Sequence, residues 1–289
     1  MSLHRYSQLV TAATFILLIA GGLVTSTDSG LSVPDWPLSY GQYFPPMIGG
    51  IRFEHTHRVI AGLVGLLTLA LALFFLRKEE RGWVQGIGVT ALIMVVAQAV
   101  LGGLTVIYLL PAPISVLHAC LGQTFFCTLA ALALFTSTEW RETAPLSAES
   151  LPSLKRLLAL TTALIYLQLV AGAIVRHTQG LGTGYHVLFA FLIVFHVLFA
   201  VLKIAKDPVL QPRLFPHAVF LGGLIVAQIF LGLGAFIMTQ MLPKAEMPRT
   251  GEVLFATAHQ ATGALILAVS LLLTLRSFRL FKPAVEQGS

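Results

Sequence analysis

Long stretches without any charged residue alternate with short charged segments along this chain. The uncharged stretches are 6–27, 59–76, 82–138, 157–175, 177–202, 214–243 and 253–275. Each reaches the roughly 18 residues that allow a helix to cross a bilayer. The stretch 82–138 is too long for one crossing, and Pro111 and Pro113 divide it, because proline removes a backbone donor and disfavours helix in the residue before it. The pattern therefore predicts eight membrane-spanning helices.

The composition agrees with a chain that lies mostly in a membrane. Of its 289 residues, 56% are hydrophobic and only 10% are charged, against about 25% charged in an average soluble domain. Eight helices leave one long loop, at about 27–54. We therefore expect an all-α integral membrane protein without a separate soluble domain.

The basic residues indicate how the helices are oriented. Sorting the Lys and Arg residues by loop places thirteen on the side that holds both termini and five on the other side. By the positive-inside rule, both termini are cytoplasmic in a multi-pass protein of the plasma membrane. The net charge is +6. The basic residues that produce it lie in short loops beside membrane spans, so we do not expect a nucleic-acid partner.

The second half of the sequence repeats the first. Four short matches occur in the same order in both halves, one for each helix of a four-helix unit: 20–24 with 171–175, 57–61 with 186–190, 97–102 with 227–232, and 118–122 with 259–263. An even number of spans per repeat makes the halves parallel repeats. We expect two four-helix bundles, at 1–140 and 152–289. The repeat includes the first span, so we expect that span in the mature protein rather than a cleaved signal peptide.

Four histidines recur at matching positions of the two repeats. They are His57, His118, His186 and His259. All lie within about the first two turns of spans that run from the outside inward, so they share one depth near the outer surface. An imidazole inside a membrane span is costly unless it is paired or ligated. Each of the four is therefore a candidate metal ligand.

Two histidines in each repeat favour bis-histidine heme over zinc. Zinc takes four ligands, often including cysteine or carboxylate, whereas a porphyrin supplies four nitrogens and needs only axial ligands. Cys120 and Cys127 lie in one span and are expected to pack as small apolar side chains. The sequence thus predicts one heme in each repeat. The remaining histidines are expected to be structural or solvated: His4, His55, His177, His196 and His217.

One carboxylate distinguishes the two repeats. Glu54 precedes His57 by one helical turn, whereas Thr183 holds the corresponding position before His186. A carboxylate beside an axial ligand can act as a general base or stabilise positive charge at the porphyrin edge; it can also simply favour the helix N-terminus. Arg58 and Arg176 are candidate contacts for heme propionates, or cations that face lipid headgroups.

Three segments resemble those of one family. The run Glu54-His55-Thr56-His57-Arg58 resembles the Glu-His-x-His-Arg signature of heme A synthases. Residues 34–37, Pro-Asp-Trp-Pro, resemble the first outer loop of that family, and residues 172–178 resemble the end of its fifth helix. The similarity covers essentially the whole chain. It implies an oxidoreductase that hydroxylates the C8 methyl of heme O twice, after which water is lost to leave the formyl group of heme A for terminal oxidases.

The resemblance also implies roles for the histidines and for partners. His186 and His259 would hold a permanent heme B cofactor, while His57 and His118 would bind the substrate heme O with Glu54 at the reacting edge. A heme O synthase and a membrane electron donor or acceptor are implied partners, and a homo-oligomer stays open. Many members carry a cysteine pair around the Asp-Trp-Pro of the first loop, where this chain has Val33 and Ser39.

Two other functions use the same histidines. A diheme b-type cytochrome would pass electrons from a quinol and leave both hemes unchanged. A heme transporter or chaperone would use the outer histidines for transfer and would not need Glu54. Recovery of chemically altered heme distinguishes the oxidising enzyme from both.

Overall fold

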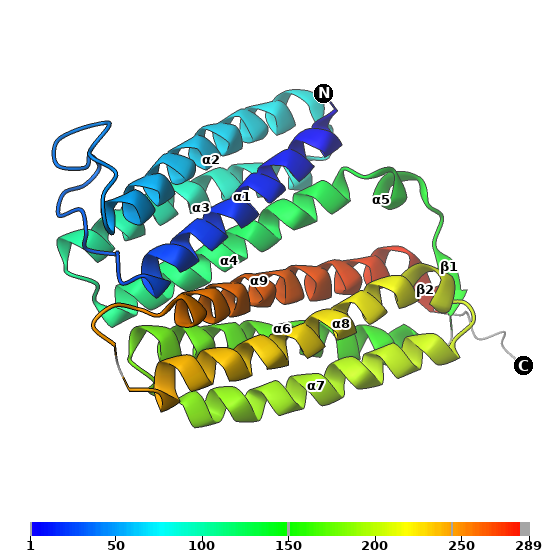
Figure 1. Cartoon of the computed structure of the whole chain (residues 1–289). Coiled ribbons are helices and arrows are strands. Elements are labelled where there is room, and N and C mark those ends of the chain that lie inside the picture. Colours follow the sequence, from blue (N-terminus) through cyan, green and yellow to red (C-terminus); the bar gives the residue numbers. More distant parts are fainter. Residues whose placement is uncertain (1, 149–150, 244, 284–289) are drawn as a thin grey trace, which may run out of the picture.

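The computed structural model describes residues 2–148, 151–243 and 245–283, and long helices dominate it (Figure 1). Eight helices in this described part are long and apolar enough to cross a membrane, which confirms the predicted number. They are α1 (Leu3–Ser26), α2 (Ile51–Lys78), α3 (Gly82–Ile107), α4 (Ala112–Phe135), α6 (Leu151–His177), α7 (Thr183–Lys206), α8 (Gln211–Phe236), which the π-helix η1 (Ile237–Met241) extends, and α9 (Thr250–Arg279).

The predicted break in the longest apolar stretch is present. Helix α3 ends at Ile107, and α4 begins at Ala112 with Pro111 as its N-cap residue. Between them, Leu109 and Leu110 both have a φ of 59°, which reverses the chain. Pro113 lies in the first turn of α4, where a missing N–H costs no helical hydrogen bond.

The helices form two groups of four that lie side by side (Figure 1). In the first group, α1 packs on α2 and α4, and α3 packs on α2 and α4; α6–α9 pack in the same way. Helices α4 and α9 lie in the middle and contact each other. Each group has a buried cluster of its own, with Val64 and Leu132 in one and Leu158 and Leu214 in the other. The division at 1–140 and 152–289, with a site in each half, stays a prediction.

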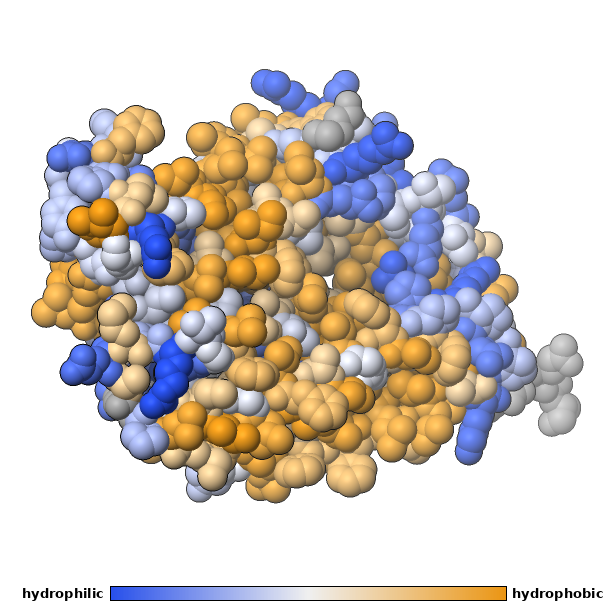
Figure 2. All heavy atoms as spheres, viewed as in Figure 1, coloured by the Kyte–Doolittle hydropathy of each residue, from blue (hydrophilic) through white to orange (hydrophobic). Residues whose placement is uncertain are grey.

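The outer faces of the helices are apolar. Leu66 is 67% exposed, Phe195 67% and Phe230 68%, which would be unfavourable in water. In Figure 2 hydrophobic residues cover the length of the helices, and hydrophilic ones gather at the two ends. The protein is a multi-pass membrane protein, and these side chains face lipid.

A short connection that the sequence did not predict joins the two groups. It contains α5 (Thr138–Glu142) and β1 (Leu146–Ala148), which pairs in parallel with β2 (Phe281–Pro283) after α9. Leu146 N donates to Leu280 O at 2.9 Å. Strands of three residues carry too little periodicity to be seen in a sequence.

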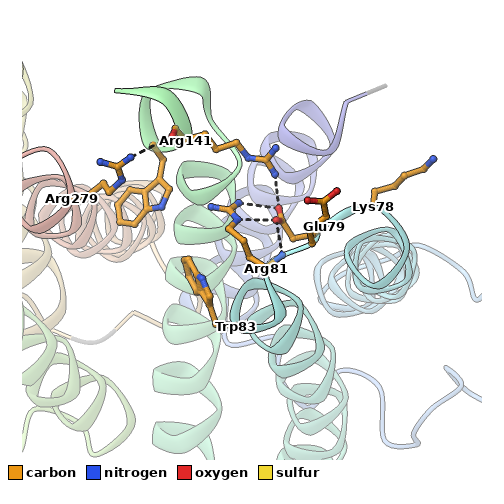
Figure 3. A pocket seen from close by; sticks show the side chains of 8 residues that line it. Lys78, Glu79, Arg81, Trp83, Arg141 and Arg279 are labelled. Carbon is orange, nitrogen blue, oxygen red and sulfur yellow. Dashed lines mark hydrogen bonds and ion pairs between the residues drawn. The ribbon is translucent and has the colours of Figure 1, made fainter. Parts of the chain in front are cut away.

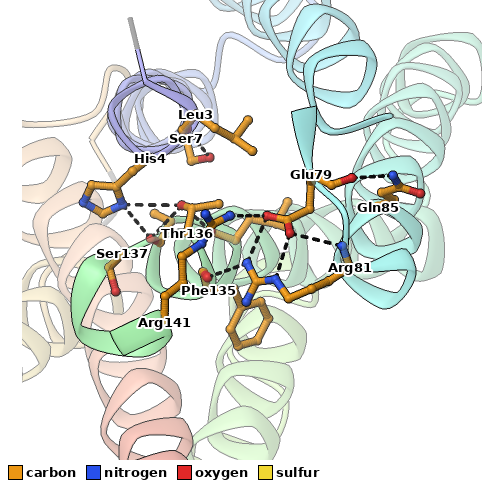
Figure 4. A network of polar contacts seen from close by, with 12 residues as sticks. Leu3, His4, Ser7, Glu79, Arg81, Gln85, Phe135, Thr136, Ser137 and Arg141 are labelled. Carbon is orange, nitrogen blue, oxygen red and sulfur yellow. Dashed lines mark hydrogen bonds and ion pairs between the residues drawn. The ribbon is translucent and has the colours of Figure 1, made fainter. Parts of the chain in front are cut away.

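The Glu79 carboxylate forms several hydrogen bonds at the end of the first helix group that lies away from the four histidines. Glu79 accepts hydrogen bonds from Arg81 Nε at 2.8 Å and from Arg141 Nη2 at 2.6 Å, and Arg81 Nη2 also donates to Phe135 O at 2.8 Å (Figure 4). These bonds join the α2–α3 turn to the end of α4 and to α5. Next to them lies a pocket of 670 Å³ (Figure 3), lined by Lys78, Glu79, Glu80, Arg81, Trp83, Trp140, Arg141 and Arg279.

Candidate functional site

Each of the four predicted histidines packs against a glycine of the helix that precedes it. The glycine belongs to α1, α3, α6 or α8, and the histidine to the next long helix. A Cβ added to the glycine would lie 2.8–3.3 Å from the ring atom Cε1, which is closer than ordinary packing. The pairs are Gly21 with His57, Gly102 with His118, Gly172 with His186, and Gly232 with His259. The sequence repeat thus appears in space as one contact formed four times.

The histidines of each half are brought together. The rings of His186 and His259 lie with centroids 6.2 Å apart at an interplanar angle of 75°. His57 and His118 are close enough for a charge on one to act on the other. His57, His118 and His186 fall in the first two turns of their helices, but His259 is the tenth residue of α9, because that helix begins at Thr250.

A backbone carbonyl lies against each ring, four residues before the glycine. His259 Nδ1 is 3.2 Å from the carbonyl oxygen of Gln228. The equivalent carbonyls, of Leu17, Gln98 and Gln168, face the rings of His57, His118 and His186 without completing a hydrogen bond to Nδ1. A metal-ligating histidine typically donates its second ring N–H to such a carbonyl. Such a contact would leave the other ring nitrogen, Nε2, for the metal.

Three glutamines that the sequence analysis did not single out line the same region. The side chains of Gln98 and Gln168 donate to the backbone oxygens of His118 and His186, at 2.9 and 2.8 Å. Gln228 Nε2 lies 3.4 Å from His259 Nε2. The recurring Gln-x-x-x-Gly spacing before each of these glycines was the signal in the sequence.

Several polar atoms here are buried without a hydrogen-bond partner. They are Nδ1 of His57, His118 and His186, and Oε1 of Gln98, Gln168 and Gln228. A buried polar atom left unpaired costs about 1–3 kcal/mol. Six such atoms at repeated positions are typical of a region that receives a ligand and not of a finished core.

Glu54 is buried and anchors the first outer loop. It is 3% exposed, its Oε2 accepts from Val33 N at 2.9 Å, and its Oε1 accepts from Arg58 Nη2 at 2.5 Å. Arg58 Nη1 also donates to the carbonyls of Asp35 and Leu38, both at 2.6 Å. Glu54 and Arg58 therefore hold the loop over α2, a role that sequence reasoning missed because it depends on contacts between residues 20 or more positions apart.

The Pro-Asp-Trp-Pro segment has a visible structural purpose. Asp35 accepts from Tyr40 N at 2.6 Å and from Gly41 N at 2.7 Å, and these donors, Gly41 above all, lower the pKa of its carboxyl. The Trp36 ring lies where a Cβ on Gly103 of α3 would be, 2.8 Å from Trp36 Cδ2. The loop therefore covers the end of the first helix group that lies close to His57 and His118. No comparably long loop joins α6 to α7, whose bounds are Leu151–His177 and Thr183–Lys206.

Arg176 lies between the two helix groups. Its Nη2 donates to Ser26 Oγ of α1 at 2.9 Å, and Thr257 Oγ1 of α9 donates to the same oxygen at 3.0 Å. Asp28 and Glu252 are near enough for their charges to act on it. Its neighbour His177 is similarly close to His118. The end of α6 thus reaches the first group at the depth of the histidines.

Three of the other histidines expected to be structural have ordinary partners, whereas Nδ1 of His217 is buried without one. His4 Nδ1 lies 2.8 Å from Ala133 O, and His55 Nδ1 lies 2.9 Å from Ser39 Oγ. His196 Nδ1 lies 3.4 Å from Thr161 Oγ1. Cys120 and Cys127 are buried free thiols. Within the described residues, no group of three His, Cys, Asp or Glu side chains could hold a metal ion, so each half offers two histidines and no larger protein ligand set.

Comparison with known proteins points to one family. The model of the family described as "Cytochrome oxidase assembly protein" matches residues 4–49 and 51–185. A heme A synthase from an Exiguobacterium species is 33% identical over 60% of this chain and 57% of its own length. Those from Exiguobacterium sibiricum and Bacillus pumilus are 32% identical, over 61% and 62% of this chain and 59% and 60% of their own lengths.

The matches leave part of each protein uncovered. The chain spans 57–60% of the length of these relatives. The family match includes Glu54, His57 and His118 but ends one residue before His186. The second histidine pair is therefore supported by the internal repeat and by its geometry. With more than half of its residues matched by the family model, the chain belongs to the cytochrome oxidase assembly protein family.

Proposed function

We propose that this protein is an oxidoreductase that converts heme O to heme A, oxidising the C8 methyl group to a formyl group by two successive hydroxylations and loss of water. The observation that carries the proposal is the fourfold contact of histidine with glycine, combined with a buried carboxylate beside only one of the histidines. The relatives named heme A synthase support the same reaction.

The residues of the second group fit a bis-histidine heme. Metal–nitrogen bonds of about 2 Å on both sides of one iron, together with the radii of the two imidazoles, require a centroid separation of about 6 Å, and His186 and His259 are 6.2 Å apart. The glycines at 172 and 232 leave room for Cε1 of each ring to approach the neighbouring helix. We assign a resident heme B to this pair; when bound, it would supply electron transfer.

The first pair, His57 and His118, is assigned to the substrate heme O. The loop held by Glu54 and Arg58 covers this pair, so it can exclude water and close over a bound substrate. Glu54 lies one turn from His57, where a carboxylate can accept a proton or stabilise positive charge at the porphyrin edge. Its bonds to Val33 N and Arg58 keep it oriented.

The arginines are assigned to charge recognition. Arg176, between the groups, is a candidate propionate contact for the second heme. Arg58 is a candidate for the substrate heme, although its guanidinium already donates to four loop or carboxylate acceptors, in Val33, Asp35, Leu38 and Glu54. A propionate at Arg58 would therefore share that arginine with the loop.

The proposal extends to location and partners. Both termini are assigned to the cytoplasm and the four histidines to the outer half of the plasma membrane. A heme O synthase would deliver the substrate within the bilayer, and a membrane electron carrier would exchange electrons. A homo-oligomer is compatible with the apolar outer faces.

Pigment extraction tests the reaction. The protein would be expressed with and without a heme O synthase, and its hemes would be extracted with acid acetone, separated by chromatography and weighed by mass spectrometry. We expect heme A only when heme O is supplied. Recovery of heme B alone under both conditions would overturn the proposal and favour the diheme cytochrome.

A further inference from the structure

The pocket beside Glu79 is lined by residues of both helix groups. Lys78 and Arg81 flank the turn between α2 and α3 in the first group. Arg141 belongs to α5, and Arg279 is the last residue of α9 in the second group. These four cations and the two glutamates of the lining leave a net charge of +2. The pocket at the junction of the two groups is therefore suited to an anion.

The arginines of this pocket are held in place but are not neutralised. Arg81 and Arg141 share the single carboxylate of Glu79, at 2.8 and 2.6 Å (Figure 3). Within the described residues, Arg279 donates to the backbone carbonyls of Thr143, at 3.1 Å, and Arg141, at 3.4 Å, and to no carboxylate. A guanidinium has five N–H donors, so each of these arginines retains donors for a further acceptor. The bonds to the protein fix the charges before a ligand binds.

Two tryptophans indicate that the pocket lies at the membrane surface. The rings of Trp83 and Trp140 both pack on Phe135, with centroids 5.0 and 4.7 Å from the centroid of that ring. The Arg81 guanidinium lies 5.5 Å from the centre of the Trp83 ring. Tryptophan is enriched at the membrane–water interface, where its ring lies at the level of the lipid headgroups. The cations of the pocket therefore lie at headgroup depth.

Exposed apolar side chains beside the pocket favour a lipid over a soluble anion. Leu76, two residues before Lys78, is 50% exposed, and Phe278, next to Arg279, is 53% exposed. Both lie in the last turn of a membrane-spanning helix, α2 or α9. A molecule with its anionic group in the pocket would therefore find apolar surface for acyl chains directly beside it.

We propose that this pocket binds the phosphate group of an anionic phospholipid. Two N–H groups of a guanidinium match two oxygens of a phosphate, and basic pockets between membrane helices bind anionic headgroups in the same way. A phosphate that accepts from Arg141 and from Arg279 joins the first helix group to the second. The bound lipid stabilises the contact between the groups, and it does so whether or not the proposed oxidation takes place.

Lipid titration tests the inference. The delipidated protein in a neutral detergent would be mixed with phosphatidylglycerol or phosphatidylcholine of identical acyl chains, and bound lipid would be counted by native mass spectrometry. Both lipids carry a phosphate, but the choline cation is repelled by the positive pocket, so we expect phosphatidylglycerol to bind more tightly. Lys78→Gln and Arg279→Gln should each weaken its binding about fivefold, the usual effect of one cation near a membrane surface.

Matched variants separate this pocket from the general charge of the surface. Arg77→Gln removes a neighbouring exposed cation that does not line the pocket and should leave lipid binding unchanged. Glu80→Gln removes a carboxylate of the lining and should strengthen binding. If Arg279→Gln does not fold, Lys78→Gln still tests the inference, because the Lys78 side chain is exposed.

Thermal stability distinguishes a lipid from free phosphate. We expect phosphatidylglycerol to raise the Tm of the wild type, and inorganic phosphate to raise it no more than sodium chloride of equal ionic strength. Equal stabilisation by inorganic phosphate and lipid would overturn the lipid assignment. Equal binding of the two lipids, unchanged binding in the folded Lys78 and Arg279 variants, or an equal loss in Arg77→Gln would overturn it as well.

Discussion

At the scale of single residues, Glu54 combines two roles that the sequence could not separate. The sequence placed it one turn from His57 and only in one repeat. The structure adds that it is buried and that it binds Val33 N and Arg58. A charge that only favoured a helix N-terminus would be exposed and without such bonds. Because this buried carboxylate is tied to both the loop and the histidine helix, we propose that it links closure of the site to its chemistry.

We predict that Glu54→Gln retains the fold and the resident heme but oxidises heme O about 10² to 10⁴ times more slowly, the usual contribution of a positioned acid or base. Glutamine has almost the same volume and still accepts from Val33 N, but it cannot take a proton. Mass spectrometry of the extracted hemes should show heme O and the singly hydroxylated alcohol.

Arg58→Gln provides the comparison for this variant. It loosens the loop but keeps the carboxylate. Equal rate losses in the two variants would assign Glu54 to loop anchoring alone, and a wild-type rate in Glu54→Gln would remove it from the chemistry.

At the scale of helices, the feature that recurs in the four-helix repeat is a glycine on one helix that leaves room for a histidine ring of the next helix. Much of this could be predicted: uncharged stretches gave the spans, and matched motifs gave the four histidines. The Gln-x-x-x-Gly spacing recurs in the sequence, but the glutamines were missed because their contacts with the histidine of the next helix are visible only in the structure. The hydrogen bonds from Arg58 to the loop carbonyls were missed because they join residues distant in sequence.

We predict that Gly232→Ala lowers the heme content of the second pair. The new Cβ would lie 2.8 Å from Cε1 of His259, so the ring or the helix must move and the axial bond is weakened. Gly223→Ala lies on the same helix, α8, with no atom within 4 Å of the added Cβ, and should keep full heme content. Heme per protein is measured by the pyridine hemochrome spectrum, and equal values for both variants would contradict the contact.

Glu79, in the turn between α2 and α3, should make the thermal stability of the protein fall at low pH. Arg81, chiefly, and Arg141 lower the pKa of Glu79 from 4.5 to about 2. A carboxyl whose pKa is lower when folded stabilises the fold above its unfolded pKa and loses that effect as the pH falls through its folded pKa. We therefore expect the detergent-solubilised protein to lose thermal stability between about pH 4.5 and 2, and Glu79→Gln to be less stable at neutral pH with a flatter acid profile.

Glu80→Gln is the matched control for this profile, because Glu80 is the exposed neighbour of Glu79 in the same turn. It should reproduce the wild-type dependence on pH. An unchanged acid profile in Glu79→Gln would show that the Arg81 and Arg141 bonds do not stabilise this end of the protein.

At the scale of the whole molecule, the orientation of the helices decides where the chemistry takes place. Eight spans put both termini on one side, and from the charge distribution we propose that this side is the cytoplasm. Reporter fusions after residues 80, 145 or 210 should report cytoplasm, and those near 40, 180 or 247 the outside. A fusion of the first set that reports the outside, or one of the second set that reports cytoplasm, would contradict the eight-span topology and the shared depth of the histidines.

The division of labour between the two histidine pairs is tested most directly by weighing the hemes that each pair retains. Wild type, a His57→Ala/His118→Ala variant and a His186→Ala/His259→Ala variant would be purified from cells that make heme O, with His196→Ala as a control on α7. We expect wild type and His196→Ala to contain heme B together with heme O or heme A. The first double variant should keep heme B and lose the other two hemes, and the second should lose heme B and make no heme A. Retention of heme O or heme A by the first double variant, or of heme B by the second, would contradict the assignment.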